Sequence, residues 1–232
     1  MHILLTRPIE DCKELIIKFK SLGHNISHMP VIKIEHKNYP EENFKEFNGI
    51  IFTSSNAIKN LDTKKIDKSI FCYCVGLLTE KVAKNNGFQN IYTAEGNVNN
   101  LKEIILQTFD KKKGKLLYVS GETISFNLDK ELISEGYSIK RLINYSVLPV
   151  EDLDIKFINA LKSSMPEIVF IYSQNSAKSF LNIIKKYQLV DCWMNTNLMC
   201  IGEKTSSVLN LIKWKKIFIF NPGEEEYLLY KI

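Results

Sequence analysis

The stretch Lys115-Leu116-Leu117-Tyr118-Val119 repeats the pattern of His2-Ile3-Leu4-Leu5-Thr6. The match continues without gaps, so that Leu128 falls on Leu15 and Gly136 falls on Gly23. Each copy reads as an apolar strand, an amphipathic helix and a glycine that ends the helix. The chain therefore contains the same strand-helix unit twice.

Two further ungapped matches extend this repeat. Ile50-Ile51-Phe52-Thr53-Ser54-Ser55-Asn56 aligns with Val169-Phe170-Ile171-Tyr172-Ser173-Gln174-Asn175. Cys74-Val75-Gly76 aligns with Cys200-Ile201-Gly202, and this match carries Thr79 onto Thr205. The three matches follow one cyclic order, in which the beginning of the chain completes a second copy whose other parts lie near the C-terminus. This order predicts two lobes related by a circularly permuted repeat.

Short runs rich in Ile, Val and Phe alternate with helical segments along the whole chain. Strands that are apolar throughout and separated by helices are typical of parallel sheets covered on both faces. The predicted fold class is therefore α/β, with two doubly wound parallel-sheet lobes that are flavodoxin-like or Rossmann-like. Each sheet is expected to have about five strands.

The repeat also predicts the domain boundaries. Residues 1–33 and 149–232 form a discontinuous first lobe, and residues 39–145 form a second lobe inserted into it. Segments 32–40 and 145–152 are then the two crossings. Both crossings have extended, partly apolar sequences, so we expect them to lie side by side as a two-stranded hinge.

Composition limits the classes of protein that this chain can represent. The 232 residues are 45% hydrophobic and 25% charged, as in globular domains, and no run approaches the ~20 apolar residues of a membrane span. The N-terminus lacks the basic leader and apolar core of a secretory signal. Five cysteines, an odd number, favour reduced thiols. The scattered basic residues show no nucleic-acid motif. We expect a cytoplasmic monomer with neither a nucleic-acid nor a membrane partner.

In doubly wound sheets, ligands bind beyond the carboxyl ends of the strands. Ser54 and Asn56 follow one predicted strand, and Ser173 follows its counterpart in the other lobe. These residues are also good helix N-caps, so capping alone remains an alternative to binding. Gly76 and Gly202 follow the next pair of strands, where a glycine lets a ligand approach the backbone closely.

Several motifs of common enzymes are missing from the sequence. It contains no G-x-G-x-x-G after a strand, no phosphate-binding P-loop, no H-E-x-x-H, no paired C-x-x-C and no G-x-S-x-G. Nucleotide cofactors, zinc and a serine-hydrolase triad are therefore not expected, and the four histidines are interpreted as structural or solvated. Tyr145 lies where the chain leaves the second lobe. Its phenol could act as a proton donor, or its ring could serve only in packing. Arg7 follows the first strand, where it could pair with a carboxylate of a ligand or of the protein.

Taken together, five segments resemble the uroporphyrinogen-III synthase family over nearly the whole chain. They are Leu4-Leu5-Thr6-Arg7-Pro8, Ile50-Ile51-Phe52-Thr53-Ser54, Val75-Gly76-Leu77-Leu78-Thr79, Gly136-Tyr137 followed by Arg141 to Tyr145, and Ile201-Gly202-Glu203-Lys204-Thr205. The resemblance implies a cofactor-independent lyase of haem biosynthesis. Such an enzyme binds hydroxymethylbilane between its lobes and closes it to uroporphyrinogen III, with inversion of the last pyrrole ring.

The resemblance also assigns roles to residues. Tyr145 corresponds to the family's general acid, and the expected substrate-binding residues are Arg7, Ser54, Asn56, Gly76, Thr79, Gly121, Ser173, Gly202 and Thr205. No metal ligand is implied. Two departures affect the carboxylate contacts: Asn56 stands where some relatives have a basic residue, and Thr123-Ile124-Ser125 stands where many have an arginine. The alternative is a non-catalytic two-lobe module that binds a small anion.

Overall fold

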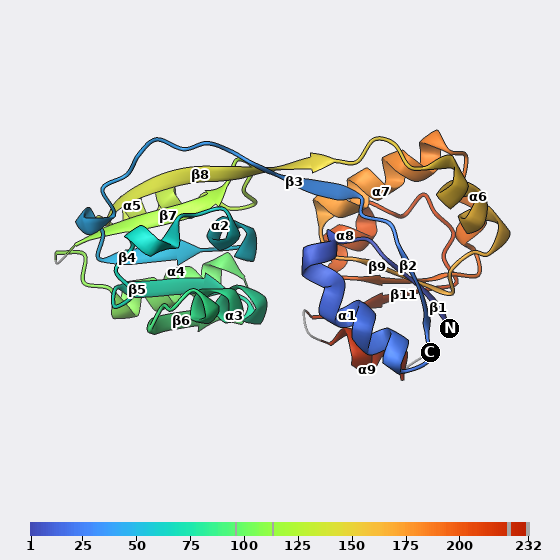
Figure 1. Ribbon diagram of the computed structural model, residues 1–232, viewed down its shortest axis with the longest axis horizontal. Helices are drawn as coiled ribbons and strands as arrows, with labels where there is room; N and C mark the ends of the chain where they lie inside the picture. The colour runs from blue at the N-terminus through green and yellow to red at the C-terminus, as the bar shows by residue number, and fades with distance from the viewer. Residues whose placement is uncertain (96, 113, 222–223, 231–232) are drawn as a thin grey trace. The chain divides into compact units, whose positions relative to one another are not determined.

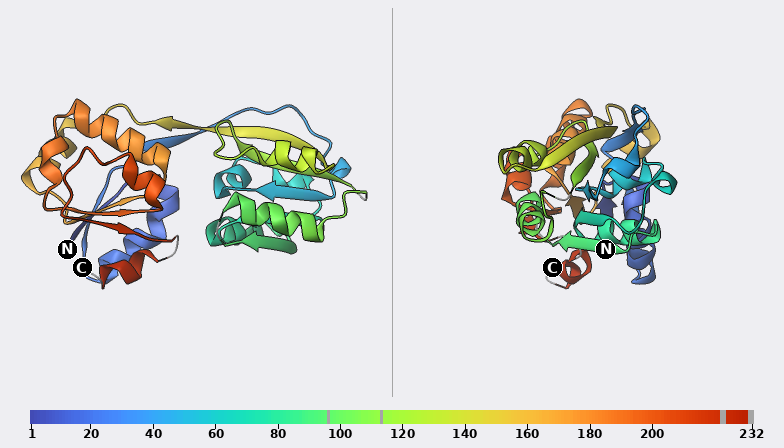
Figure 2. Two further views of the ribbon diagram at one scale, coloured as in Figure 1. Left: turned by 180° about the vertical axis from the view of Figure 1, so that it is seen from behind. Right: turned by 90° about the vertical axis from the view of Figure 1, so that its left-hand side faces the viewer.

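The computed structural model describes residues 1–95, 97–112, 114–221 and 224–230. The chain forms two compact units. Unit 1 comprises Met1–Lys33 and Leu148–Ile232, and unit 2 comprises Ile34–Val147. Each unit contains one sheet with helices on both of its faces (Figures 1 and 2).

The sheet of unit 1 has the strand order β11-β10-β9-β1-β2, and each neighbouring pair is parallel. Its strands are β1 (His2–Leu5), β2 (Asn25–His28), β9 (Ile168–Ile171), β10 (Asn197–Cys200) and β11 (Lys216–Ile219). Ile3 on β1 is in register with Ile26 on one side and with Ile168 on the other. β9 and β10 are buried along their whole length, as expected for the centre of a parallel sheet that helices cover on both sides.

Different helices cover the two faces of this sheet. On one face, α1 (Ile9–Ser21) packs through Cys12 and Phe19, and α9 (Glu225–Leu229) lies on the same side. The other face is covered by α6 (Ile155–Ser163), α7 (Gln174–Lys186) and the short helix η3 (Val190–Trp193), with α8 (Glu203–Ser207) beside α7. On that second face, the ring centroids of Phe180 and Trp193 are 5.0 Å apart.

The sheet of unit 2 has the strand order β3-β8-β7-β4-β5-β6. Its strands are β3 (Ile32–His36), β4 (Gly49–Phe52), β5 (Phe71–Val75), β6 (Asn90–Ala94), β7 (Lys115–Gly121) and β8 (Ser138–Pro149). One face packs against α2 (Ser55–Lys59), α3 (Leu77–Asn85) and the short helix η1 (Phe44–Glu46), and also against Leu61 and Ile66, which flank the short helix η2 (Thr63–Lys65). The other face packs against α4 (Val98–Thr108) and α5 (Leu128–Ser134).

β8 differs from its sequence prediction. The sequence predicted that the second lobe ends at residue 145 and that a separate crossing follows over residues 145–152, whereas β8 is continuous from Ser138 to Pro149. Its neighbour β3 explains the extra length. Lys37 N–H donates to the carbonyl oxygen of Asn144 (2.9 Å), and Val150 N–H donates to that of Val31 (2.9 Å). This antiparallel pairing keeps the backbone of β8 extended as far as Pro149.

The predicted fold class is confirmed, because the sheet of unit 1 and strands β8-β7-β4-β5-β6 of unit 2 are parallel and have helices on both faces, and only the edge strand β3 is antiparallel. If the strands of unit 2 are numbered along the chain from β4 (first) to β8 (fifth), they lie across the sheet in the order third, second, first, fourth, fifth. β3 adds an outer strand beside β8. Unit 1 has the same order when it is counted from β9 through β11 and then on to β1 and β2. The direction of strand progression therefore reverses between β4 and β7 in unit 2 and between β9 and β1 in unit 1. Ligands of doubly wound sheets bind at the carboxyl end of such a switch point.

Candidate functional site

At the switch point of unit 1, two residues that are far apart in sequence lie together. Arg7 follows β1 and Tyr172 follows β9, and the guanidinium carbon Cζ of Arg7 lies 4.6 Å from the centroid of the Tyr172 ring. The neighbouring strand ends are joined by Thr6, whose hydroxyl donates to the carbonyl oxygen of Phe170 (2.6 Å). The parallel pairing of β1 with β9 therefore places a cation over an aromatic ring at the carboxyl edge of the sheet.

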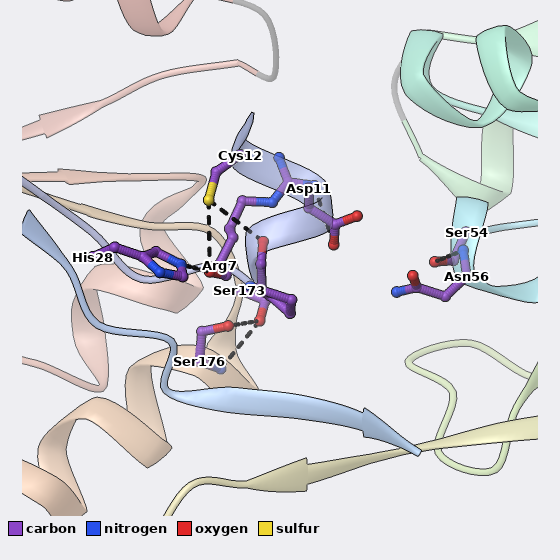
Figure 3. Close-up of polar contacts among 9 residues, drawn as sticks. Arg7, Asp11, Cys12, His28, Ser54, Asn56, Ser173 and Ser176 are labelled. Carbon is purple, nitrogen blue, oxygen red and sulfur yellow. Dashed lines mark hydrogen bonds and ion pairs between the residues drawn. The ribbon is translucent and has the colours of Figure 1, made fainter. Parts of the chain in front are cut away.

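Two hydrogen bonds hold the backbone around Arg7. Its carbonyl oxygen lies 2.8 Å from Nε2 of His28, and the Cys12 thiol donates to the carbonyl oxygen of Pro8 at 3.4 Å (Figure 3). Burial raises the pKa of the Cys12 thiol to about 11, so this group stays protonated at neutral pH. The Arg7 side chain is 27% exposed, and one of its guanidinium nitrogens lies 4.0 Å from an oxygen of Asp11. Arg7 thus combines a fixed backbone with a partly exposed charge.

The ring of Tyr172 is fixed by two other aromatic rings. Phe170 stacks against it at 6.2 Å, and Phe220 meets it edge-on at 5.7 Å. The hydroxyl of Tyr172 is buried and has no hydrogen-bond partner among the described residues. Burial, and secondarily the nearby Glu225, raise the pKa of Tyr172 well above its ordinary value. The phenol is therefore neutral at physiological pH.

The switch point of unit 2 carries a different pair. Thr53, directly after β4, lies with its hydroxyl 3.2 Å from the hydroxyl of Tyr118 on β7. Tyr118 is only 1% exposed, and burial raises its pKa even though Arg141 acts in the opposite direction. Sequence reasoning missed this phenol. The one available signal was that Tyr118 lies in the repeated strand, where its counterpart is the apolar Leu5.

Arg141 on β8 holds the segment that follows β7. Its Nε donates to the Ser120 hydroxyl (2.8 Å), and its Nη2 donates to the carbonyl oxygens of Gly121 (2.8 Å) and Glu122 (2.9 Å). Residues 123–125 include no arginine, although many members of the resembled family have one there. The structure brings a guanidinium to this segment from a neighbouring strand, although these three hydrogen bonds all go to the protein itself.

Tyr145, the predicted general acid, lies on β8 opposite Gly121. It is 7% exposed and belongs to the core cluster that includes Phe52 and Val119. A Cβ atom at position 121 would lie 2.8 Å from Cε2 and Cζ of the Tyr145 ring and 3.1 Å from its hydroxyl. Glycine at 121 is therefore required by the ring of Tyr145, whatever else approaches it.

The predicted serines cap helices in both units. Ser54 accepts a hydrogen bond from Asn56 N–H at 3.3 Å, and Ser173 accepts one from Ser176 N–H at 3.1 Å (Figure 3). The hydroxyls of Ser173 and Ser176 are also 2.9 Å apart. Asn56 is half-buried in the short helix α2. The capping interpretation is thus confirmed for both serines, and any contact with a ligand would be additional to it.

Gly76 and Gly202 adopt nearly the same backbone conformation, with φ of +79° and ψ of 151° in one and φ of +74° and ψ of 154° in the other. This region is accessible almost only to glycine. A Cβ atom at either position would meet nothing within 4 Å, so the space beside each backbone is open. Thr79 and Thr205 lie in the helices that follow, and each is 4% exposed.

The site residues therefore group by unit. Arg7, Ser173, Gly202 and Thr205 lie at the carboxyl edge of unit 1, and Ser54, Asn56, Gly76, Thr79, Gly121 and Tyr145 lie in unit 2 at or beside the carboxyl ends of its strands. Within the described part of the chain, no three His, Cys, Asp or Glu side chains are placed to hold a metal ion.

Comparisons with known proteins point to one family. The family described as uroporphyrinogen-III synthase HemD matches residues 13–221. The chloroplastic uroporphyrinogen-III synthase of Oryza sativa subsp. japonica is 27% identical over 104 residues, which are 45% of this chain. The match spans only 32% of the rice protein.

Two solved structures share the fold. Uroporphyrinogen-III synthetase from Helicobacter pylori aligns over 100% of this chain and 99% of its own, with a TM-score of 0.64 and 21% identity. A mutant uroporphyrinogen III synthase from Thermus thermophilus aligns over 100% of this chain and 97% of its own, with a TM-score of 0.56 and 14% identity.

Proposed function

This chain belongs to the uroporphyrinogen-III synthase family, and on that premise we propose that it closes hydroxymethylbilane to uroporphyrinogen III. The reaction loses water and inverts the last pyrrole ring, as a step of haem biosynthesis. The observation that carries the proposal is that the carboxyl ends of the central strands in both units carry polar side chains and open glycines. Two such edges suit a long, flexible substrate with many polar groups.

In this proposal the substrate is bound by an ion pair and by hydrogen bonds. Hydroxymethylbilane carries eight carboxylates, and the partly exposed guanidinium of Arg7 is suited to pair with one of them. Ser54, Asn56 and Ser173 offer hydroxyl and amide groups. At Gly76 and Gly202, the open space beside the backbone lets substrate approach without a side chain in the way. Thr79 and Thr205 are assigned to the same two edges, one in each unit.

The chemistry needs one proton donor and strict control of conformation. In the proposed mechanism the Tyr145 phenol donates its proton to the terminal hydroxyl, and the carbon–oxygen bond breaks as water leaves with the bonding electrons. The pyrrole nitrogen supplies electrons to form an azafulvene cation, and the substituted carbon of ring D attacks this cation. The spirocyclic intermediate then fragments and recloses at the free α-carbon of ring D, and the proton that this carbon loses restores the phenol. Holding this geometry is an entropic contribution, and the acid adds about 10² to 10⁴ in rate.

The proposal also covers the cellular compartment, the oligomeric state and the partners of the enzyme. We place the enzyme in the cytoplasm as a monomer that acts on a small molecule, with no nucleic-acid or membrane partner. All five cysteines are free thiols, as is usual in a reducing compartment. Among the described residues, no helix has both the length and the apolar character needed to cross a membrane.

The decisive experiment supplies the purified protein with freshly prepared hydroxymethylbilane and separates the oxidised porphyrin products by isomer. Predominance of isomer III supports the proposal. Isomer I alone, formed at the rate of the protein-free control, contradicts it. In an active protein, Tyr145→Phe should lower the rate of isomer III formation without abolishing it. Tyr92→Phe, which changes a half-buried tyrosine on β6, is the matched control and should leave the rate unchanged.

The burial of Tyr145 favours one other candidate function. A phenol that is 7% exposed and packed in a core suits a non-catalytic module that binds a small anionic ligand. Such a module would retain the Arg7 edge and would not need an acid. Saturable binding of uroporphyrin, without any isomer III formed from hydroxymethylbilane, would support this second function.

A further inference from the structure

The internal repeat gives each residue of the Arg7 edge a counterpart in unit 2. Arg7 corresponds to Ser120, and Tyr172 corresponds to Thr53. The cation and its aromatic partner are therefore present together in unit 1 and absent together from the same two positions of unit 2. The two residues also come from different strands, so neither position determines the other through local sequence. Their joint presence suggests that they act as a pair.

The contacts of Arg7 show what the ring contributes. Cζ of Arg7 lies 4.6 Å from the centroid of Tyr172, whereas the Asp11 carboxylate lies 4.0 Å from a guanidinium nitrogen, at the outer limit of an ion pair. A guanidinium that rests on an aromatic face keeps its N–H groups, which lie in its own plane, available for other acceptors. A bidentate ion pair with Asp11 would use two of those N–H groups. The ring therefore supports the cation without consuming its donors.

The ring itself cannot easily move. Phe170 and Phe220 contact Tyr172 from two directions, with interplanar angles of 24° and 90°. The Tyr172 hydroxyl is buried and has no hydrogen-bond partner among the residues that the structure describes. A buried hydroxyl that makes no hydrogen bond carries a free-energy cost, so hydrogen bonding does not account for this side chain. The aromatic face explains its presence instead.

We propose that Tyr172 is a positioning residue that holds the Arg7 guanidinium across its ring and so presents it to a carboxylate of the substrate. This inference rests on the proposed function, because it concerns how the same site recognises hydroxymethylbilane. Tyr172 does not take part in proton transfer in this scheme. Its loss should therefore raise KM and leave kcat unchanged.

The kinetic test lowers the electron density on the face of the ring at position 172 and keeps the shape of the ring. Tyr172→Phe keeps the aromatic face and should leave KM unchanged. Replacing that phenylalanine with mono-, di- and trifluorophenylalanine withdraws electron density from the face, and KM for hydroxymethylbilane should rise at each step, by about three- to tenfold over the series. The same series at position 92 is the control, because among the described residues no cation lies over the Tyr92 ring. A flat KM across the series at 172, or a change in kcat instead, would overturn the proposal.

A second measurement does not depend on turnover. Aromatic ring currents move the NMR signals of protons above a ring upfield, so the Arg7 side-chain protons of the substrate-free protein should be shifted upfield in the wild type and in Tyr172→Phe. Tyr172→Met should return them to ordinary positions. Ordinary positions in the wild type would reject the positioning role whether or not the protein is active. Shifted signals in a protein that forms no isomer III would instead reject the proposed function and retain the Arg7–Tyr172 arrangement.

Discussion

The switch points of the two units have the same backbone and different chemistry. Each has a capping serine after its central strand and a glycine in the same unusual conformation after the next strand. In unit 1 the pair at the switch point is a guanidinium over a tyrosine ring, whereas in unit 2 it is two neutral hydroxyls. The shared features are those that any copy needs to start its helices. The features that differ are those that can distinguish one part of a ligand from another.

Residues that match between the two units are weak evidence for ligand binding. The sequence leaves both ligand binding and helix capping open for the matched residues Ser54 and Ser173. In the structure both serines cap helices, which is a sufficient reason for their matching positions. The asymmetric pair of Arg7 and Tyr172 is therefore a better guide to substrate recognition than the symmetric positions are.

The largest effect is expected from Gly121→Ala in unit 2. The added Cβ would overlap the Tyr145 ring at 2.8 Å and force it to move within a packed core. Overpacking of this kind should lower the free energy of unfolding by about 2 kcal/mol. Displacement of the proposed acid should also reduce isomer III formation at least tenfold, about 1.4 kcal/mol of activation free energy. Urea unfolding and porphyrin isomer analysis measure the two effects. The unit 1 counterpart of Gly121 is Pro8, so this defect is specific to unit 2.

A second substitution separates the clash from other causes. Tyr145→Leu removes most of the ring, so Gly121→Ala should cost much less in the Tyr145→Leu background than in the wild type. Equal costs in both backgrounds would show that the glycine is needed for a reason other than the ring.

The glycines after β5 and β10 should respond equally to substitution. Gly76→Ala and Gly202→Ala each place an L-residue at a backbone conformation that strains it, with no steric clash to add, so each should cost about 1–3 kcal/mol. Trp193 and Trp214 are the only tryptophans and both lie in unit 1, so tryptophan fluorescence follows the unfolding of that unit. Circular dichroism follows both units. A cost at one glycine and none at the other would show that the two turns are not equivalent.

The sequence predicted the parts of this molecule that depend on local pattern and on repetition. Apolar runs gave the strands, and the repeat gave the polar segments after β4 and β9. The pattern led us to expect that segments 32–40 and 145–152 lie side by side, but it did not show that the second of them continues β8 as one unbroken strand. The Arg7–Tyr172 and Thr53–Tyr118 contacts were not predicted either, since each forms only when two distant strands become neighbours. The proposed roles of the site residues remain predictions.

Removing the two helix caps should have a smaller effect. Ser54→Ala and Ser173→Ala each leave a backbone N–H without its side-chain acceptor, at a cost of about 1 kcal/mol. Ser173→Ala should cost the more of the two, because Ser173 also bonds to the Ser176 hydroxyl. Thermal unfolding measures the stability. If KM for hydroxymethylbilane stays unchanged, capping is the whole role of these serines, whereas a raised KM with unchanged kcat would show that they also contact substrate.

The smallest expected effect is a gain in stability at the end of α7, where a non-glycine residue stands at a position that is glycine after at least one helix in each unit. Gln188, two residues after the end of α7, has a φ of +55°, and Leu189 N–H donates to the carbonyl oxygen of Ile184 (2.7 Å). The turns after α1 and α5 place Gly23 and Gly136 at the equivalent point. A non-glycine residue is strained there, so Gln188→Gly should raise the free energy of unfolding by up to about 1 kcal/mol. Tryptophan fluorescence during urea unfolding measures this change. A loss of stability would mean that the Gln188 side chain contributes more than its backbone conformation costs.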